Sequence, residues 1–512
     1  MIDSLSCAKT WLINRARKFS PVQAAFICSL LLSLIAIVTS PTLNRDGMLY
    51  VDTARVFQES GFAAAKANFN WPFLPILMAC VSWLTGLSPE FAGHLTNSLF
   101  MAGAMALMVA CARRQFPEAV WPICLVLLAL PGLNHYRDEV LREYGCWFFS
   151  LLSFWLALLW SATPRWKTAL AVQISLGVSA LFRPEALAFF PALMLWQVFA
   201  APKDDRLRRL LMLGALPLIG LAVLLMLSLS GQLSVADRLS GEFARINMAR
   251  FDTKAKTLAE ALIPYARDQA RTILLFGSLA IIPLKFLKHM GIFFLPLLIL
   301  LSSAYWRTAL IRWQLFAWVF LAHLLVLAVF VVDLQFLAGR YVVVLHLLSA
   351  PLIGFGLWLF MQRFPRWGSV FVLLSVLLMF SNVVSFSPKK SHFSEAGAWL
   401  SANVKKSPRI YSESPRTAYY AGWSFLQAIG EVKDRSLLSQ ALAEKKYDLL
   451  VLEISSNEPD IDTWLNSSGL QEIQRFSHSK REAILIAEPK LDRGQDKAAK
   501  TERIRRKTDS IE

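Results

Sequence analysis

Long apolar runs recur along the first three quarters of the chain, and they constrain its fold more than any other feature. A helix needs about 20 mainly apolar residues to cross the hydrocarbon of a bilayer. Runs that approach this length begin at residues 21–40 and recur as far as residues 368–386. A soluble core does not require such runs in close succession, so the sequence predicts an all-α polytopic membrane protein.

We expect about eleven transmembrane helices from these runs. They are placed at residues 21–40, 91–112, 118–133, 144–161, 168–182, 186–200, 210–230, 282–303, 314–332, 341–361 and 368–386. Residues 71–87 are not counted, because Pro72 and Pro75 remove two backbone donors and favour a juxtamembrane or re-entrant helix at the outer surface. The longest connection, residues 231–281, is expected to form amphipathic helices on the outer leaflet.

The charges between the runs indicate which side each connection faces. A net charge of +17 would suit a nucleic-acid-binding protein, but basic residues that flank apolar spans orient a membrane protein instead. Alternate connections carry the excess of Lys and Arg, namely Lys9, Arg15, Arg17, Lys18, Arg113, Arg114, Arg165, Lys167, Lys203, Arg206, Arg208, Arg209, Arg307, Arg312, Arg363 and Arg366. The other short connections are balanced in charge. The sequence therefore predicts a cytoplasmic N-terminus and no nucleic-acid partner.

The composition changes after residue 386, where the chain becomes normally polar. Residues 409–411 and 447–452 resemble short buried strands, and residues 395–404 and 437–446 resemble helices. We therefore divide the chain into a transmembrane domain of residues 1–386, an extracytoplasmic α/β domain of residues 387–489 and a disordered charged tail of residues 490–512.

Four polar sites lie at the predicted outer ends of the spans. They are Asp46 with Asp52, the turn of residues 135–143, Phe182-Arg183-Pro184-Glu185, and residues 333–341. A charged side chain near hydrocarbon costs several kcal/mol of free energy unless it is ion-paired or hydrated. Each site also has a simpler interpretation, in which ion-paired loop ends face water. The convergence of all four on one face of the membrane is the stronger indication of function.

The first of these sites follows directly after the first span and places two carboxylates just beyond the hydrocarbon. Gly47 is expected to let the backbone turn sharply where the first span ends. We expect Asp46 to be catalytic and Asp52 to lie about a turn and a half further along a helix.

A metal site has only weak support in the sequence. His135, Glu139 and Glu143 have four-residue spacing, which would align them on one helical face for a divalent ion, although surface helices carry charges at that spacing routinely. No cofactor is certain, and a divalent metal is possible. His323 and His346 lie within predicted spans and are expected to be donors in helix packing. The six cysteines lie singly and indicate neither disulfides nor zinc.

Several short motifs in this order carry a resemblance to a known family. They are Asp46-Gly47 followed by Tyr50 and Ala54, the proline-bearing residues 71–79, the acidic turn 137–143, residues 182–187, and Gly339-Arg340-Tyr341 at the start of a late span. With this order and topology the chain resembles the GT-C-type glycosyltransferases of the broad dolichyl-phosphate-mannose-protein mannosyltransferase and aminoarabinose-transferase superfamily.

The resemblance implies transfer of a sugar from a polyprenyl-phosphate donor to a lipid, glycan or protein acceptor, with inversion, at the outer face of a bacterial inner membrane. It implies that Asp46 is the general base and that the C-terminal domain is periplasmic. Some relatives carry an Asp-Glu pair in the first loop, whereas Gly47 follows Asp46 here, so the second carboxylate would be Asp52 or Asp138. The expected substrate-binding residues are Asp52, Lys66, Glu139, Glu143, Arg183, Glu185, Arg340 and Tyr341, of which Arg340, Arg183 and Lys66 are candidates for the carrier phosphate.

Two other functions are considered. A transporter or flippase for a lipid-linked sugar would place ionisable residues near the bilayer midplane and show paired internal repeats, and the sequence has no such repeat. A non-catalytic scaffold of an envelope-assembly complex would not require acidic residues at several turns on one face.

Overall fold

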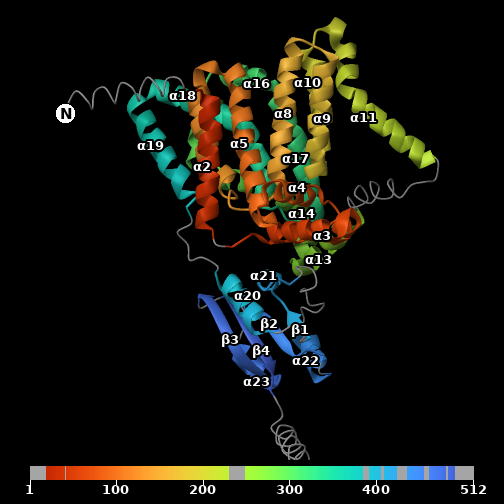
Figure 1. The fold of residues 1–512 in the computed structure, drawn as a ribbon. Coiled ribbons are helices and arrows are strands. Elements are labelled where there is room, and N and C mark those ends of the chain that lie inside the picture. The colour runs from red at the N-terminus through yellow and green to blue at the C-terminus, as the bar shows by residue number, and fades with distance from the viewer. Residues whose placement is uncertain are drawn as a thin grey trace, which may run out of the picture. The chain divides into compact units, whose positions relative to one another are not determined.

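The computed structural model describes residues 19–40, 42–229, 248–384, 391–404, 409–423, 435–444, 446–454, 461–479 and 482–490 of the 512-residue chain. The chain divides into two compact units. One comprises residues 1–39 and 76–385, and the other comprises residues 40–75 and 386–512. The first unit is helical, and the second contains the strands (Figure 1).

Six described helical segments of the first unit are long and apolar enough to cross a membrane on their own. They are α2 (Pro21–Thr39), α5 (Pro89–Gln115), α8 (Arg142–Ala162), the segment Pro264–Lys288 that ends in α14 (Ala270–Lys288), α17 (Gln314–Leu334) and α18 (Gly339–Arg363). A bent pair, α15 (Phe294–Ser302) and α16 (Trp306–Arg312), raises the number to seven if it forms one span. The chain is therefore an integral membrane protein, as the sequence predicted.

The other helices of this unit are shorter or more polar. They are α4 (Phe73–Thr85), α6 (Val120–Ala129), α7 (Pro131–Asn134), α9 (Trp166–Phe182), α10 (Phe189–Ala200), α11 (Arg206–Leu229), α13 (Met248–Ala261) and α19 (Pro365–Ser381), and α4 begins at the boundary with the second unit. The start of α4 after Trp71-Pro72 agrees with a short helix there. The count of eleven spans stays a prediction, because several of these helices are shorter than the bilayer requires.

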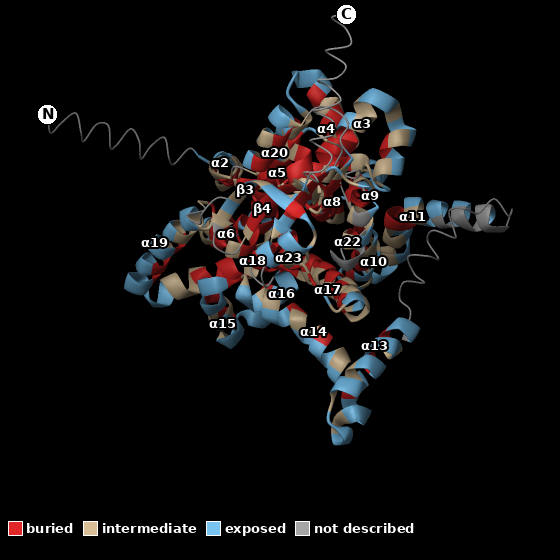
Figure 2. Cartoon of the chain, turned by 90° about the horizontal axis from the view of Figure 1, so that it is seen from below, coloured by how far each residue is buried: buried red, intermediate tan, exposed pale blue. Residues whose placement is uncertain are grey.

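Helix α18 is at the centre of the first unit. In its most apolar stretch 78% of residues are buried, compared with 33% in α17. Two glycines allow neighbouring backbones to approach it closely, since a Cβ at Gly354 would lie 2.5 Å from the Ile123 Cα and one at Gly356 would lie 2.1 Å from the Pro296 carbonyl oxygen. Figure 2 shows the contrast between this buried centre and the largely exposed α13.

The predicted span at residues 282–303 is wrong. Helix α14 ends at Lys288, and α15 starts at Phe294 after a short turn. The break falls at Gly291, whose φ of 57° an L side chain rarely adopts. Lys285, Lys288 and His289 precede this turn and were a usable signal, which the predicted span crossed. The connection predicted at residues 231–281 likewise ends earlier, because α14 begins at Ala270; residues 230–247 lie outside the described part.

The second unit contains a four-stranded sheet in the order β1-β2-β4-β3. Its strands are β1 (Ile410–Ser412), β2 (Leu449–Ile454), β3 (Leu470–Ser479) and β4 (Glu482–Pro489), with helices α20 (His392–Asn403), α21 (Pro415–Tyr420), α22 (Arg435–Ala443) and α23 (Ile461–Ser467). Strands β1 and β2 and helices α20 and α22 confirm the sequence prediction, which missed the β3–β4 hairpin. Apolar clusters pack around Leu450 and Leu452 and around Val451 and Ile484, as period-2 alternation requires. The predicted tail lies outside the described residues from 491 onward.

Helix α3 (Arg45–Asn68), which follows the first span, belongs to this second unit. The Leu43 backbone N–H donates to the Tyr420 hydroxyl at 2.8 Å. The Arg55 guanidinium lies over the Tyr419 ring, 5.3 Å from its centroid. The segment that carries Asp46 and Asp52 is thus attached to the C-terminal α/β fold.

Candidate functional site

Three helix ends of the first unit bring four charged side chains together. Glu143 is in the first turn of α8, and Arg340 is in the first turn of α18. Arg183 caps the C-terminus of α9, where Pro184 prevents the helix from continuing, and Glu185 follows in a short 3-10 helix. Two sites predicted separately from the sequence, residues 182–185 and 333–341, therefore meet at Glu143 of a third.

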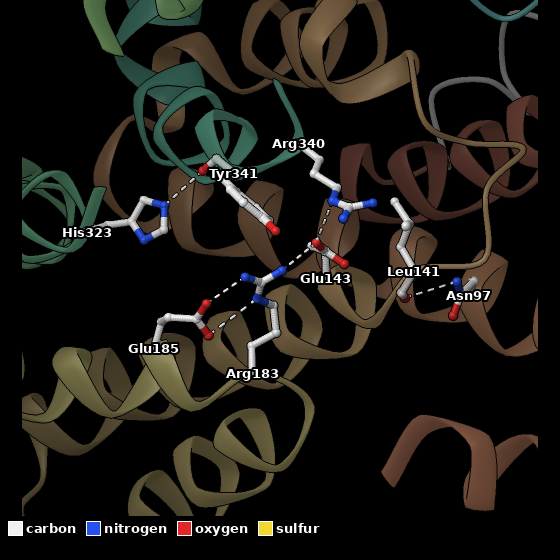
Figure 3. Close-up of polar contacts among 8 residues, drawn as sticks. All are labelled: Asn97, Leu141, Glu143, Arg183, Glu185, His323, Arg340 and Tyr341. Carbon is white, nitrogen blue, oxygen red and sulfur yellow. Dashed lines mark hydrogen bonds and ion pairs between the residues drawn. The ribbon is translucent and has the colours of Figure 1, made fainter. Parts of the chain in front are cut away.

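Glu143 joins the two guanidinium groups. Its Oε1 lies 2.5 Å from Arg183 Nη1 and 3.2 Å from Arg340 Nε (Figure 3). Arg183 also makes a two-point contact with Glu185, at 2.6 Å from Nη2 and 3.4 Å from Nε. The Glu143 side chain is only 5% exposed, so this group of charges is paired away from most of the solvent.

Tyr341 completes the cluster between the two arginines. The Arg183 guanidinium lies 4.6 Å from the centre of its ring, and the Arg340 guanidinium lies 5.5 Å from it. Cations over an aromatic face gain further electrostatic attraction. His323 Nε2 lies 3.0 Å from the Tyr341 carbonyl oxygen and links α17 to α18 at this point. The prediction that His323 serves helix packing agrees with this contact.

The paired charges fix the protonation of Arg183. Burial lowers the pKa of its guanidinium, but the adjacent Glu143 and Glu185 carboxylates outweigh burial and hold the pKa well above its ordinary value. Arg183 is therefore a permanent cation. Arg183 contacts both carboxylates and so connects Glu185 to Glu143, which also contacts Arg340.

A small pocket lies beside the cluster. It has a volume of about 50 Å³ and is lined by Glu143, Arg183, Arg340, Tyr341 and apolar side chains of α8 and α17. That volume holds about one or two water molecules. Two guanidinium groups and two carboxylates, Glu143 and Glu185, thus lie at the mouth of an apolar slot.

The residues predicted from the first loop lie in the second unit. Asp46 is half-buried in the first turn of α3, and Asp52 lies further along the same helix, as expected. Asp52 is 8% exposed and accepts a hydrogen bond from Asn68 Nδ2 at 3.3 Å. Lys66 is exposed in the last turn of α3.

The expected role of Gly47 is wrong. It does not form a sharp turn but lies within the first turn of α3. A Cβ there would lie 2.5 Å from the Asn44 side-chain oxygen and 3.0 Å from Leu43. A larger residue at this position would therefore require the Asn44 and Leu43 side chains to shift.

The proposed alignment of His135, Glu139 and Glu143 is also wrong. Helix α7 ends at Asn134 and α8 begins at Arg142, so no continuous helix carries the three side chains. Within the described residues, no group of three His, Cys, Asp or Glu side chains is arranged to hold a metal ion. Asp138 and Glu139 are half-exposed in the turn between the two helices. The four-residue spacing was misleading because the turn interrupts it.

Arg137 does not face water with the other charges of this turn, as the simpler interpretation of that cluster supposed. It is 3% exposed, and its Nη1 donates to the Ser29 carbonyl oxygen at 2.9 Å and to Ser33 Oγ at 3.1 Å. Its Nε donates to Asn134 Oδ1 at 2.7 Å. Sequence reasoning missed this anchor, although two serines four residues apart on an apolar helix were a usable signal.

Two lysines form a further contact that sequence reasoning missed. Lys285 of α14 donates to the Leu337 carbonyl oxygen, and Lys254 of α13 donates to the Asp333 carbonyl oxygen at 2.8 Å. Both therefore hold the loop that leads into Arg340. His346 Nε2 lies 2.8 Å from the Phe286 carbonyl oxygen and so joins α18 to α14, in agreement with its predicted packing role.

Comparisons with known proteins give a likeness in structure only. No protein-family model matches the chain, and no curated protein matches it. The chain is similar to the crystal structure of ArnT from Cupriavidus metallidurans bound to undecaprenyl phosphate, with 15% sequence identity over 90% of this chain and 97% of that chain and a TM-score of 0.45. The apo state of the same protein gives 15% identity over 94% of this chain and 98% of that chain, with a TM-score of 0.44.

Proposed function

We propose that the chain is a membrane glycosyltransferase that transfers a sugar from a polyprenyl-phosphate carrier to a lipid, glycan or protein acceptor of the cell envelope. The observation that supports it most is the Arg183–Glu143–Arg340 cluster at three helix ends beside an apolar slot. A carrier of this class has a phosphate at the end of a hydrocarbon chain. Fixed guanidinium groups are suited to stabilise such a phosphate.

Within the cluster we assign the phosphate to Arg340. Arg183 uses three nitrogens on Glu143 and Glu185, and its side chain is 14% exposed. The Arg340 side chain also contacts Glu143, but at 23% exposed it is the more accessible of the two guanidinium groups. Arg340 is therefore the guanidinium that meets the carrier phosphate, while Arg183 and Glu143 hold it in place.

The reaction requires a base as well as a phosphate site. The acceptor hydroxyl or amine attacks the anomeric carbon, the bond from that carbon to the phosphate oxygen breaks, and the carrier leaves as polyprenyl phosphate. The proton of the acceptor passes to Asp46, and the anomeric configuration is inverted. A positioned carboxylate base contributes on the order of 10² to 10⁴ in rate. Asp52 or Asp138 supplies the second carboxylate near the acceptor.

Lipid-glycan analysis of a deletion strain tests the function. Mass spectrometry of membrane extracts should show loss of one glycosylated species and accumulation of its polyprenyl-phosphate sugar donor. The wild-type gene should restore the product, and Asp46→Asn should not, at equal protein abundance. Glu59→Gln, an exposed carboxylate on the same helix, is the matched control and should restore it. Unchanged glycolipids in the deletion strain would exclude the proposed activity, and movement of the donor across the membrane without transfer would indicate a flippase.

A further inference from the structure

A second cavity lies at the other end of α18. It has a volume of about 760 Å³ and is lined by α15, α16, the last two turns of α18 and Glu118. Arg340 and Arg363 are separated by most of α18, which at 1.5 Å per residue places them roughly 35 Å apart. The cavity is therefore distinct from the Arg183–Glu143–Arg340 cluster, and nothing in the proposed function uses it.

The cavity exists because a span is broken. Pro296 of α15 approaches Gly356 of α18 so closely that no side chain fits at that glycine. One to two turns further along, Ile299 and Ser302 of α15 and Leu359 of α18 line open space. At Ser302 helix α15 stops, and α16 continues at 103° to it. The bend removes the turns of helix that would otherwise fill the space next to α18.

Positive charge exceeds negative charge around this cavity. Arg312 Nη1 lies 2.6 Å from Glu118 Oε1, and this ion pair closes one wall. Arg363 also lines the cavity and lies 5.6 Å from the centre of the Phe364 ring. No described carboxylate forms an ion pair with Arg363. The side chains that line the cavity thus carry one more positive charge than negative charge. Arg307 and Arg366 lie nearby in the sequence.

The remaining surface of the cavity is suited to a bilayer molecule. Phe355, Trp358 and Leu359 give it an apolar and aromatic lining, and Ser302 and Ser303 add two hydroxyl groups. The outer face of α15 next to it is apolar and exposed, with Leu298 at 42% and Leu301 at 52%. Aromatic and basic side chains at one level, continuous with an apolar helix face, are typical of the boundary between headgroups and acyl chains.

We propose that this cavity binds one anionic phospholipid of the surrounding bilayer. Its phosphate-bearing headgroup lies between Arg363 and Arg312, and its acyl chains follow the exposed face of α15. Basic pockets between membrane helices recognise anionic headgroups by charge, and the volume is in the range of pockets for ligands of this size. The positive-inside pattern assigns this end of α18 to the leaflet richer in anionic lipid. The inference is independent of the proposed glycosyl transfer.

Native mass spectrometry of the full-length protein tests the proposal. The protein is reconstituted with phosphatidylglycerol and phosphatidylcholine in equal amounts and released stepwise into detergent. We expect one phosphatidylglycerol to be retained by the wild-type protein in preference to phosphatidylcholine. Arg363→Gln should lower that retention by roughly fivefold, since one basic residue near a membrane surface contributes about that factor.

Two further variants make the result decisive. Leu359→Trp keeps every charge but places a bulky ring on the cavity wall, and it should also lower selective retention. Arg208→Gln is the matched control, because Arg208 is an exposed basic residue of α11 outside the cavity and should leave retention unchanged. Equal retention of the two lipids by the wild-type protein would overturn the proposal. A folded Leu359→Trp variant that retains phosphatidylglycerol as the wild-type protein does would also overturn it. This second test remains available even if Arg363→Gln does not fold.

Discussion

Arginines lie at both ends of α18, but their surroundings differ. At its start, Arg340 and Arg183 are bound to one nearly buried carboxylate, and the neighbouring pocket holds only about 50 Å³. At its end, Arg363 and Arg312 border about 760 Å³ of space with a single carboxylate between them. The first arrangement fixes charges in one geometry, which suits the phosphate site proposed there. The second leaves charge and volume open, as binding of a flexible lipid requires.

The largest expected effect is the loss of Glu143. Glu143→Gln leaves two guanidinium groups close together without the carboxylate they share, and breaking a buried ion pair in this way costs about 3–5 kcal/mol. Thermal unfolding in detergent should show a clearly lowered midpoint, together with loss of transfer activity. Asp205→Asn removes a half-buried pair with Arg209 and an exposed pair with Arg208, but the Asp205 carboxylate is itself 29% exposed, so it should shift the midpoint less. Equal shifts in the two variants would show that the cluster is not the rigid end of α18.

Separate substitutions of Arg340 and Arg183 should distinguish the residue that binds phosphate from the residue that stabilises the cluster. Arg340→Gln should lower the rate of transfer by about 10² to 10³, the usual loss when one group that stabilises developing charge is removed, with little change in the unfolding midpoint. Arg183→Gln should instead lower the midpoint, because Glu185 loses its partner and Glu143 keeps only Arg340. Transfer kinetics and unfolding measured on the same preparations check this. The opposite pattern would reverse the assignment of Arg340 to the phosphate.

Cysteine labelling tests whether the two ends face opposite sides of the membrane. Phe336 precedes α18 and is 60% exposed, and Trp367 follows it and is 68% exposed. A membrane-impermeant thiol reagent applied to intact cells should modify Phe336→Cys and spare Trp367→Cys, with the unsubstituted protein as background. Modification of Trp367→Cys alone would mean that the orientation is reversed and that the N-terminus is outside.

The smallest effect is expected at the open end. Arg312→Gln breaks its ion pair with Glu118, but the Arg312 side chain is 44% exposed, so the loss of stability should be below about 1 kcal/mol. The unfolding midpoint should stay within error of the wild type when anionic lipid is absent. A loss comparable to that of Glu143→Gln would contradict the difference between the two ends.

Much of this organisation could be predicted from the sequence. Apolar length and the change of composition near residue 386 gave the helical membrane fold and two of the four strands. Arg183, Glu185 and Arg340 were selected because charges at span ends need partners. The pairing of Arg183 with Glu185 was foreseen as an ion-paired loop end, and the structure shows it. The contacts of Glu143 with Arg183 and Arg340 were not predictable, since these residues lie far apart along the chain and meet only through helix packing.

The predictions were wrong where the local sequence pattern did not show how the helices break or pack. The predicted span at residues 282–303 crossed Lys285, Lys288 and His289, so the break before α15 was missed although polar residues marked it. The spacing of His135, Glu139 and Glu143 implied a helix that Val140 and Leu141 interrupt. Arg137 looked like its charged neighbours but turns inward to Ser29 and Ser33, because polar groups on α2 satisfy it there. No periodicity reports such long-range pairings.

The most direct test of the central claim uses purified protein in liposomes that contain a polyprenyl-phosphate sugar and an acceptor identified from the deletion strain. The assay follows the sugar on the acceptor and the release of polyprenyl phosphate in equal amounts. We predict that Asp46→Asn loses at least about 10² in rate while Glu59→Gln retains the wild-type rate, both at normal folding. A folded Asp46→Asn variant that transfers sugar at the wild-type rate would contradict the account.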